Sequence, residues 1–88
     1  MYFLYMIQDS KNHLYIGISD NPTRRLEEHN NKQGAEFTKK SSDFRIVFLE
    51  THLTPKDARS REIQLKKWSR IKKEKLIHMY KNGIDTKI

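Results

Sequence analysis

Two short apolar runs joined by a polar segment constrain the fold of this chain more than any other feature. Residues 2–7 (YFLYMI) and 14–18 (LYIGI) are rich in aromatic and branched side chains, and residues 9–12 (DSKN) lie between them. Strand-forming runs on either side of turn-forming residues predict an antiparallel β-hairpin. Both runs are apolar at odd and even positions, which is typical of strands covered on both faces. We therefore expect a sheet with helices packed against it.

Pairing of the hairpin about Ser10 would place Tyr5 opposite Tyr15, with both rings on one side of the sheet. Cross-strand packing is the commoner use of such a pair, and the alternative is that the two hydroxyls reach a polar site. Gly17 weakens the second strand unless something must approach its backbone closely. It therefore indicates where another element or a ligand comes near.

Helix-start signals divide the remainder of the chain. Asn21-Pro22 predicts a helix over 22–31, Thr54-Pro55 a helix to about Trp68, and Ser69 a helix over 70–81. Residues 44–50 (FRIVFLE) read as a third strand, and residues 32–43 read as a polar loop anchored by Phe37. The order β-β-α-β-α-α predicts an α+β fold, a small three-stranded sheet flanked by helices.

The length of 88 residues fits one domain, with a core over about 2–80 and a frayed tail over 82–88. The absence of cysteine excludes a disulfide framework and a cysteine-based zinc site. No apolar run approaches the roughly 18 residues of a spanning helix, and the N-terminus does not read as a signal peptide. We expect a cytoplasmic protein that does not bind membranes.

A net charge of +7 predicts attraction to polyanions, with nucleic acid first. Basic residues concentrate in the run 66–75, which contains Lys66, Lys67, Arg70, Lys72, Lys73 and Lys75. Such a run on a helix is more often a solvated surface. The alternative is a track for a nucleic-acid backbone, with salt-sensitive affinity that is indifferent to sequence.

Three further residues could carry chemistry. Glu62 falls inside the apolar stripe of its helix, where a carboxylate needs a partner or a metal ion, although an exposed carboxylate with a local ion pair is the commoner arrangement. Arg25 and His29 are four residues apart and share a helical face. Arginine offers a planar fork to phosphate oxygens, and histidine can accept a proton near neutral pH. The plain alternative is a solvated helix surface, but this helix has Leu26 as its one large apolar residue, so some of its polar face must look inward.

The ordered set of these residues resembles the GIY-YIG nuclease superfamily, and is most similar to its small single-domain bacterial members. The matching stretches cover about residues 2–77: Leu4-Tyr5, Leu14 to Ser19, Arg24 to His29, Gly34 to Thr38 and Arg59 to Arg70. The resemblance implies a three-stranded antiparallel sheet flanked by helices. It also implies metal-dependent hydrolysis of a phosphodiester in nucleic acid, DNA more than RNA, by an endonuclease or exonuclease.

The resemblance also assigns roles. Glu62 would bind one divalent cation, Mg²⁺ or Mn²⁺, since carboxylate and water suit such hard ions. Tyr5 would activate the attacking water, Tyr15 would position the water or the phosphate, and Arg25 would clamp the scissile phosphate. His29 would be an alternative base or phosphate contact. The expected nucleic-acid-binding residues are Arg24, Arg25, Lys39, Lys66, Lys67 and Arg70.

Two departures from the family pattern are visible. The first motif reads Phe3-Leu4-Tyr5, so its Gly and Ile are absent while its tyrosine remains. Many family nucleases carry an Asn beyond the helix of the glutamate, and here no Asn follows Glu62 until Asn82. The second departure favours the alternative function, a catalytically weak or silent nucleic-acid-binding module on the same scaffold. A protein-interaction domain with an incidental basic surface is a third hypothesis.

Overall fold

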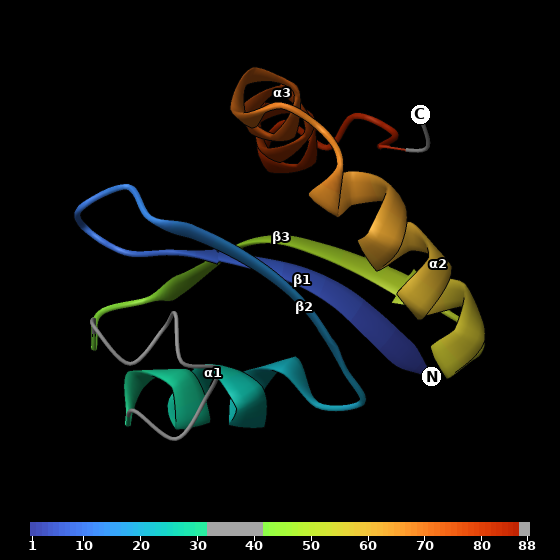
Figure 1. The fold of residues 1–88 in the computed structure, drawn as a ribbon, viewed down its shortest axis with the longest axis horizontal. Coiled ribbons are helices and arrows are strands. Elements are labelled where there is room, and N and C mark those ends of the chain that lie inside the picture. Colours follow the sequence, from blue (N-terminus) through green and yellow to red (C-terminus); the bar gives the residue numbers. More distant parts are fainter. Residues whose placement is uncertain (32–41, 87–88) are drawn as a thin grey trace.

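A computed structural model describes residues 1–31 and 42–86, and within them it places a mixed α+β domain (Figure 1). The elements are β1 (Tyr2–Gln8), β2 (Leu14–Ser19), α1 (Pro22–Asn30), β3 (Arg45–His52), α2 (Pro55–Lys66) and α3 (Arg70–Lys81). The strands form one antiparallel sheet in the order β2-β1-β3. This confirms the fold class and the order β-β-α-β-α-α. No helix among the described residues has the length and apolar character needed to cross a bilayer.

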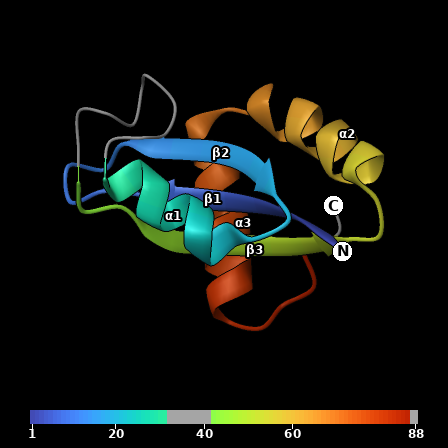
Figure 2. The same cartoon turned by 90° about the horizontal axis from the view of Figure 1, so that it is seen from below.

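Helices lie on both faces of the sheet (Figures 1 and 2). Helix α3 crosses one face, and its Leu76 and Ile77 pack with Leu4 and Met6 of β1. Helix α1 lies against the other face, where Leu26 packs on a cluster built around Tyr5, Ile7 and Phe44. The central strand is therefore buried on both sides, as its uninterrupted apolar sequence predicts.

The expected caps set the helix starts. The side chains of Asn21, Thr54 and Ser69 each accept a hydrogen bond from a backbone N–H in the first turn of α1, α2 and α3. Helix α2 ends two residues before the expected Trp68. The Trp68 ring is covered instead by the Arg61 guanidinium at 5.5 Å and the Lys72 ammonium at 4.3 Å, measured to its centroid.

The hairpin register differs from the expected one. Tyr5 pairs with Gly17 and Ile7 pairs with Tyr15, so the expected pairing of Tyr5 with Tyr15 is wrong. The cause is an asymmetric turn after Asp9. The buried Asp9 carboxylate accepts hydrogen bonds from the N–H groups of Lys11 (3.0 Å) and His13 (2.8 Å), and Asn12 takes a positive φ of 68°. The two tyrosines still lie on one face of the sheet, but diagonally.

Beyond α3 the chain makes hydrogen bonds as far as Thr86. Gly83 adopts a positive φ of 69° at the end of α3, and the Ile84 N–H bonds the Met79 carbonyl at 2.9 Å. The Arg61 guanidinium donates to the Thr86 carbonyl at 3.0 Å. Of the tail expected to fray over 82–88, the structure describes residues 82–86, and these make the hydrogen bonds above.

Candidate active site

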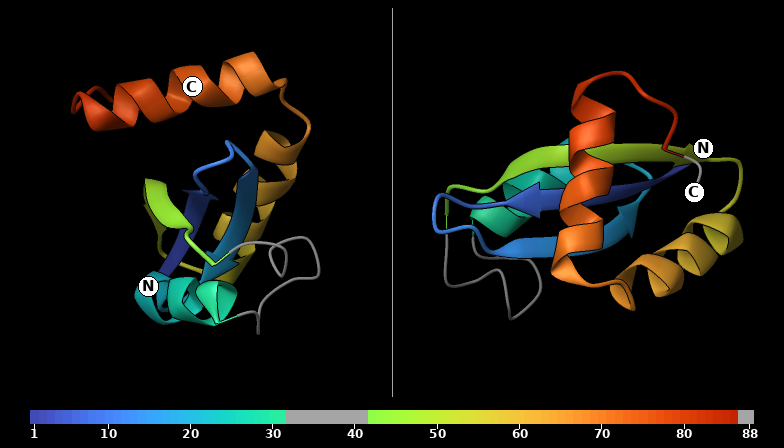
Figure 3. Two further views of the ribbon diagram at one scale, coloured as in Figure 1. Left: turned by 90° about the vertical axis from the view of Figure 1, so that its left-hand side faces the viewer. Right: turned by 90° about the horizontal axis from the view of Figure 1, so that it is seen from above.

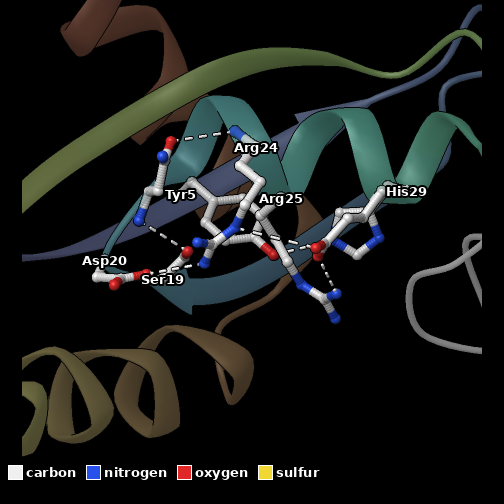
Figure 4. Close-up of polar contacts among 8 residues, drawn as sticks. Tyr5, Ser19, Asp20, Arg24, Arg25 and His29 are labelled. Atoms are coloured by element: carbon white, nitrogen blue, oxygen red, sulfur yellow. Dashed lines mark hydrogen bonds and ion pairs between the residues drawn. The ribbon is translucent and has the colours of Figure 1, made fainter.

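The centre of the candidate site is a buried contact between Tyr5 and His29 (Figure 4). Tyr5 lies on β1 facing α1, and its side chain is 1% exposed. His29 is in the last turn of α1 and is 0% exposed. The Tyr5 hydroxyl and His29 Nε2 are 2.9 Å apart. Which of the two groups donates depends on the tautomer of His29: the phenol donates to Nε2 if the imidazole carries its proton on Nδ1.

Burial keeps both groups neutral. It raises the pKa of Tyr5 to about 12, and nearby Tyr15 adds to this effect while the Arg25 guanidinium opposes it. Burial, with the Arg25 charge, lowers the pKa of His29 to about 4. At neutral pH the pair is therefore a phenol next to an imidazole that can accept its proton.

Gly17 makes room for this arrangement. A methyl group built on Gly17 would lie 2.5 Å from the Tyr5 hydroxyl oxygen and 2.7 Å from the ring carbon that bears it. The close approach that the sequence indicated at Gly17 is thus made by the Tyr5 ring of the neighbouring strand.

We expect Gly17→Ala to displace the Tyr5 ring and break its contact with His29. Overpacking of this kind costs about 1–3 kcal/mol of unfolding free energy, measurable by urea denaturation. A matched Gly83→Ala variant has open space around the new methyl group and meets only the penalty of its positive φ. An unchanged Tyr5 environment in Gly17→Ala, seen by NMR, would contradict the steric argument.

Arg25 lies on α1 near the same contact. Its side chain is 31% exposed, and its guanidinium donates to the Glu28 carboxylate at 2.8 Å. This ion pair lowers the pKa of Glu28 and raises that of Arg25. Arg25 also acts on the Tyr5 hydroxyl through charge and hydrogen bonding. Arg24 points outward instead, where it pairs with Asp20 at 3.0 Å.

Tyr15 approaches the pair from β2. Its ring stands edge-on to the His29 ring, with the centroids 5.0 Å apart. The structure thus gathers Tyr5, Tyr15, Arg25 and His29 on the sheet face that α1 covers. His29 is fully buried, so the alternative of a solvated helix surface does not hold for it.

Glu62 is held on the sheet-facing side of α2. It is buried with Ala58 and Leu65 at helical spacing, and its side chain is 10% exposed. Lys66 Nζ lies 3.2 Å from one carboxylate oxygen, and Arg59 Nε lies 3.6 Å from the other. The carboxylate is therefore both buried and locally paired, which combines the two arrangements that the sequence left open.

Two observations place Glu62 on the side of the tyrosines. Burial and nearby Tyr15 are the largest causes of the raised pKa of Tyr5, and Arg25 opposes them. The Glu62 charge is a further cause that raises this pKa. Lys66, the ion-pair partner of Glu62, lines a surface pocket together with Tyr15. The carboxylate therefore does not lie on the far side of the molecule from the two phenols.

The donor set decides which metal ion could fit. Among residues 1–31 and 42–86 no group of three or more His, Cys, Asp and Glu side chains is placed to share an ion. Mg²⁺ and Mn²⁺ accept one carboxylate oxygen and take the other positions from water and substrate phosphate. A single ion of this type on Glu62 fits the residues present, and it would displace Lys66 from the carboxylate.

Among the basic residues expected to bind nucleic acid, some form ion pairs and others are exposed. Arg70 pairs with Glu74 at 3.0 Å, Lys67 is exposed, and Lys66 is half-exposed beside Glu62. Lys39 lies outside the described residues. Sequence reasoning did not single out Lys73, which lines the pocket with Lys66 and Tyr15. The signal for Lys73 in the sequence was its position in the basic run 66–75.

Burial of His29 has a measurable consequence for stability. Its pKa is about 4 in the folded chain and 6.5 in a model peptide, so between these values the unfolded chain binds a proton that the folded chain does not. Stability from this residue is therefore complete above pH 6.5 and is lost as the pH falls toward 4. Between pH 7 and pH 4.5, we expect the unfolding free energy of the parent to fall by about 2 kcal/mol more than that of His29→Gln.

Urea denaturation at the two pH values measures this difference. His78→Gln, which removes an exposed imidazole from α3, is the matched control and should lose as much as the parent. Equal pH dependence in the parent and in His29→Gln would show that His29 is not held neutral by the fold.

Comparison with known proteins shows the family to which this chain belongs. Residues 1–75 match the model of the GIY-YIG catalytic domain. A UPF0213 protein of Staphylococcus aureus strain Mu3, and another of strain Mu50, are each 36% identical over 76 residues, which cover 86% of this chain and 93% of theirs. The solution NMR structure of a UPF0213 protein from Bacillus halodurans is similar, with a TM-score of 0.58 and 28% identity over 90% of this chain and 85% of that one. The chain thus belongs to the GIY-YIG catalytic domain family.

Proposed function

We propose that this domain hydrolyses phosphodiester bonds in nucleic acid, DNA in preference to RNA, with one divalent metal ion. The observation that carries the proposal is the buried Tyr5–His29 hydrogen bond, with Arg25 and Glu62 around it. A buried, hydrogen-bonded phenol and imidazole also occur in ordinary cores, so the position of this pair beside Arg25 and Glu62 is what points to chemistry. Perturbed pKa values of this kind cluster where protons are transferred.

Each residue of the site has its own role in the proposed reaction. A water oxygen attacks phosphorus while the water proton passes to the Tyr5 oxygen and the Tyr5 proton passes to His29 Nε2. The phosphorus–oxygen bond to the leaving strand breaks, and that oxygen takes a proton from solvent. Arg25 hydrogen-bonds the phosphate oxygens as charge develops on them. A metal ion held by Glu62 supplies Lewis-acid polarisation of the phosphate when bound.

This route requires a neutral His29. An imidazole with a pKa of about 4 is neutral at neutral pH, so in the tautomer that carries its proton on Nδ1 it can accept the Tyr5 proton at Nε2, but its low pKa also makes it a weak base. The Tyr5 hydroxyl therefore need not lose its proton to bulk solvent, which its pKa of about 12 would oppose. Tyr15, edge-on to His29, limits the movement of the ring.

The alternative is a nucleic-acid-binding module without turnover. Two observations favour it: the family Asn is absent between Glu62 and Asn82, and Lys66 and Arg59 already neutralise the Glu62 carboxylate. The test is a cleavage assay on single-stranded, duplex and branched DNA and RNA with Mg²⁺ and Mn²⁺. The proposal expects metal-dependent turnover that EDTA abolishes. Salt-sensitive binding with no turnover on any substrate would establish the module instead.

A further inference from the structure

A pocket of about 250 Å³ lies along the outer edge of β2 and is not used by the chemistry above. It is lined by Leu14, Tyr15, Ile16, Lys66 and Lys73. Strand β2 is an edge strand, because the sheet order is β2-β1-β3. The corner between α2 and α3 passes beside this edge, as the right panel of Figure 3 shows, and brings in the two lysines.

The lining combines apolar and aromatic surface with positive charge. Leu14 and Ile16 belong to the cluster under α3, whereas Tyr15 belongs to the opposite face, so the pocket wraps around the strand edge. Lys73 is partly buried, and no carboxylate pairs with it in the part of the chain that the structure describes. An aromatic wall beside lysines is the combination that binds a nucleobase together with its phosphate.

The pocket adjoins the candidate active site through two of its residues. The Tyr15 ring also contacts His29, with centroids 5.0 Å apart. Lys66 also contacts the Glu62 carboxylate at 3.2 Å. A group in this pocket would therefore lie next to a phosphate held between Arg25 and Glu62.

We propose that this pocket is a subsite for one unpaired nucleobase adjacent to the scissile phosphate, with Lys73 on a flanking phosphate. The inference rests on the proposed function and specifies its substrate class. Pockets for drug-sized ligands measure roughly 300–1,000 Å³, so a pocket of about 250 Å³ is of a size for a ligand as small as one base. The preferred substrate is consequently single-stranded, tailed or branched nucleic acid rather than blunt duplex.

The first experiment titrates the intact chain with small probes in metal-free buffer and follows its methyl groups by NMR. Adenosine 5′-monophosphate is expected to shift the Leu14 and Ile16 methyl resonances saturably, whereas ribose 5-phosphate is not, because it lacks the base. Equal shifts with both probes would reduce the pocket to a phosphate site. No shifts with either would overturn the subsite.

The second experiment compares two substitutions on the same helix. Lys73→Glu and Lys75→Glu change the net charge equally, but only Lys73 lines the pocket. We expect Lys73→Glu to weaken binding of a single-stranded DNA oligonucleotide about tenfold more than Lys75→Glu does, and to remove the preference for a single strand over blunt duplex. Equal losses in the two variants would show general electrostatics and overturn the proposal.

The two proposals fail separately. Both experiments measure binding and not cleavage, so a protein that never cuts nucleic acid can still show the base subsite. A protein that cuts blunt duplex as fast as a single strand, with the Leu14 and Ile16 resonances unmoved by adenosine 5′-monophosphate, would keep the nuclease and lose the subsite.

Discussion

Glu62→Gln is expected to lower metal-dependent cleavage by a factor on the order of 10³ while leaving the fold intact. The substitution keeps the size and shape of the side chain but removes the charge that would hold a divalent ion. Loss of one group that stabilises developing charge typically costs 10²–10³ in rate, and loss of the metal ion adds to that. The other carboxylate near the site, Glu28, is paired with Arg25 at 2.8 Å, so we expect no compensation by a neighbour.

The measurement is the initial cleavage rate on the best substrate, together with Mn²⁺ binding followed by electron paramagnetic resonance. The parent should bind one Mn²⁺ ion and Glu62→Gln none. Glu74→Gln, on the exposed side of α3 and paired with Arg70, is the matched control and should cut at the parental rate. Undiminished cleavage by Glu62→Gln would remove Glu62 from the reaction.

The stability of Glu62→Gln separates a chemical role from a structural one. The carboxylate is paired with Lys66 and Arg59, both of which are largely exposed, so the lost ion pairs should cost no more than about 1 kcal/mol. A thermal unfolding curve close to that of the parent, with cleavage abolished, is the expected combination.

Tyr5→Phe is expected to reduce the cleavage rate by a factor of about 10²–10⁴, the usual contribution of one positioned proton-transfer group. The ring remains and fills the same space over Gly17, but His29 loses the hydroxyl 2.9 Å from its Nε2. Nucleic-acid binding should change little, because the Arg25 guanidinium and the basic residues are untouched.

Tyr80→Phe is the control, since Tyr80 is half-exposed on α3 and packs edge-on against Phe48 away from the site. It should cleave like the parent. Tyr5→Phe should also lose about 1 kcal/mol of unfolding free energy, the worth of a buried hydrogen bond. Cleavage by Tyr5→Phe at the parental rate would show that the Tyr5–His29 contact serves packing only.

The sequence predicted the elements well because their signals are local. Pro22 and Pro55 each follow a capping side chain and mark a helix start within a few residues, and apolar periodicity identifies the strands. Residues 2–7 are apolar at both odd and even positions, and this pattern also predicted burial on both faces. The register of the hairpin was missed because the carboxylate of Asp9 reorganises the turn through contacts that no strand pattern reports.

The site was predictable only in part. Family resemblance named Tyr5, Tyr15, Arg25, His29 and Glu62, but it did not show that Tyr5 and His29 share a hydrogen bond. Sequence alone also left Glu62 open between an exposed ion pair and a buried ligand. Its partial burial on α2 depends on how that helix packs on β1 and β2.

By itself the sequence determined which segments become strands and which become helices, since local propensity and apolar spacing decide where these elements form. It also determined the net charge of +7, which predicts attraction to polyanions. Only the tertiary structure decided which polar groups meet, because a hydrogen bond between residues 5 and 29 depends on the packing of a helix on a sheet. That packing buries a phenol beside an imidazole, and their desolvation shifts both pKa values in the direction that keeps the pair neutral.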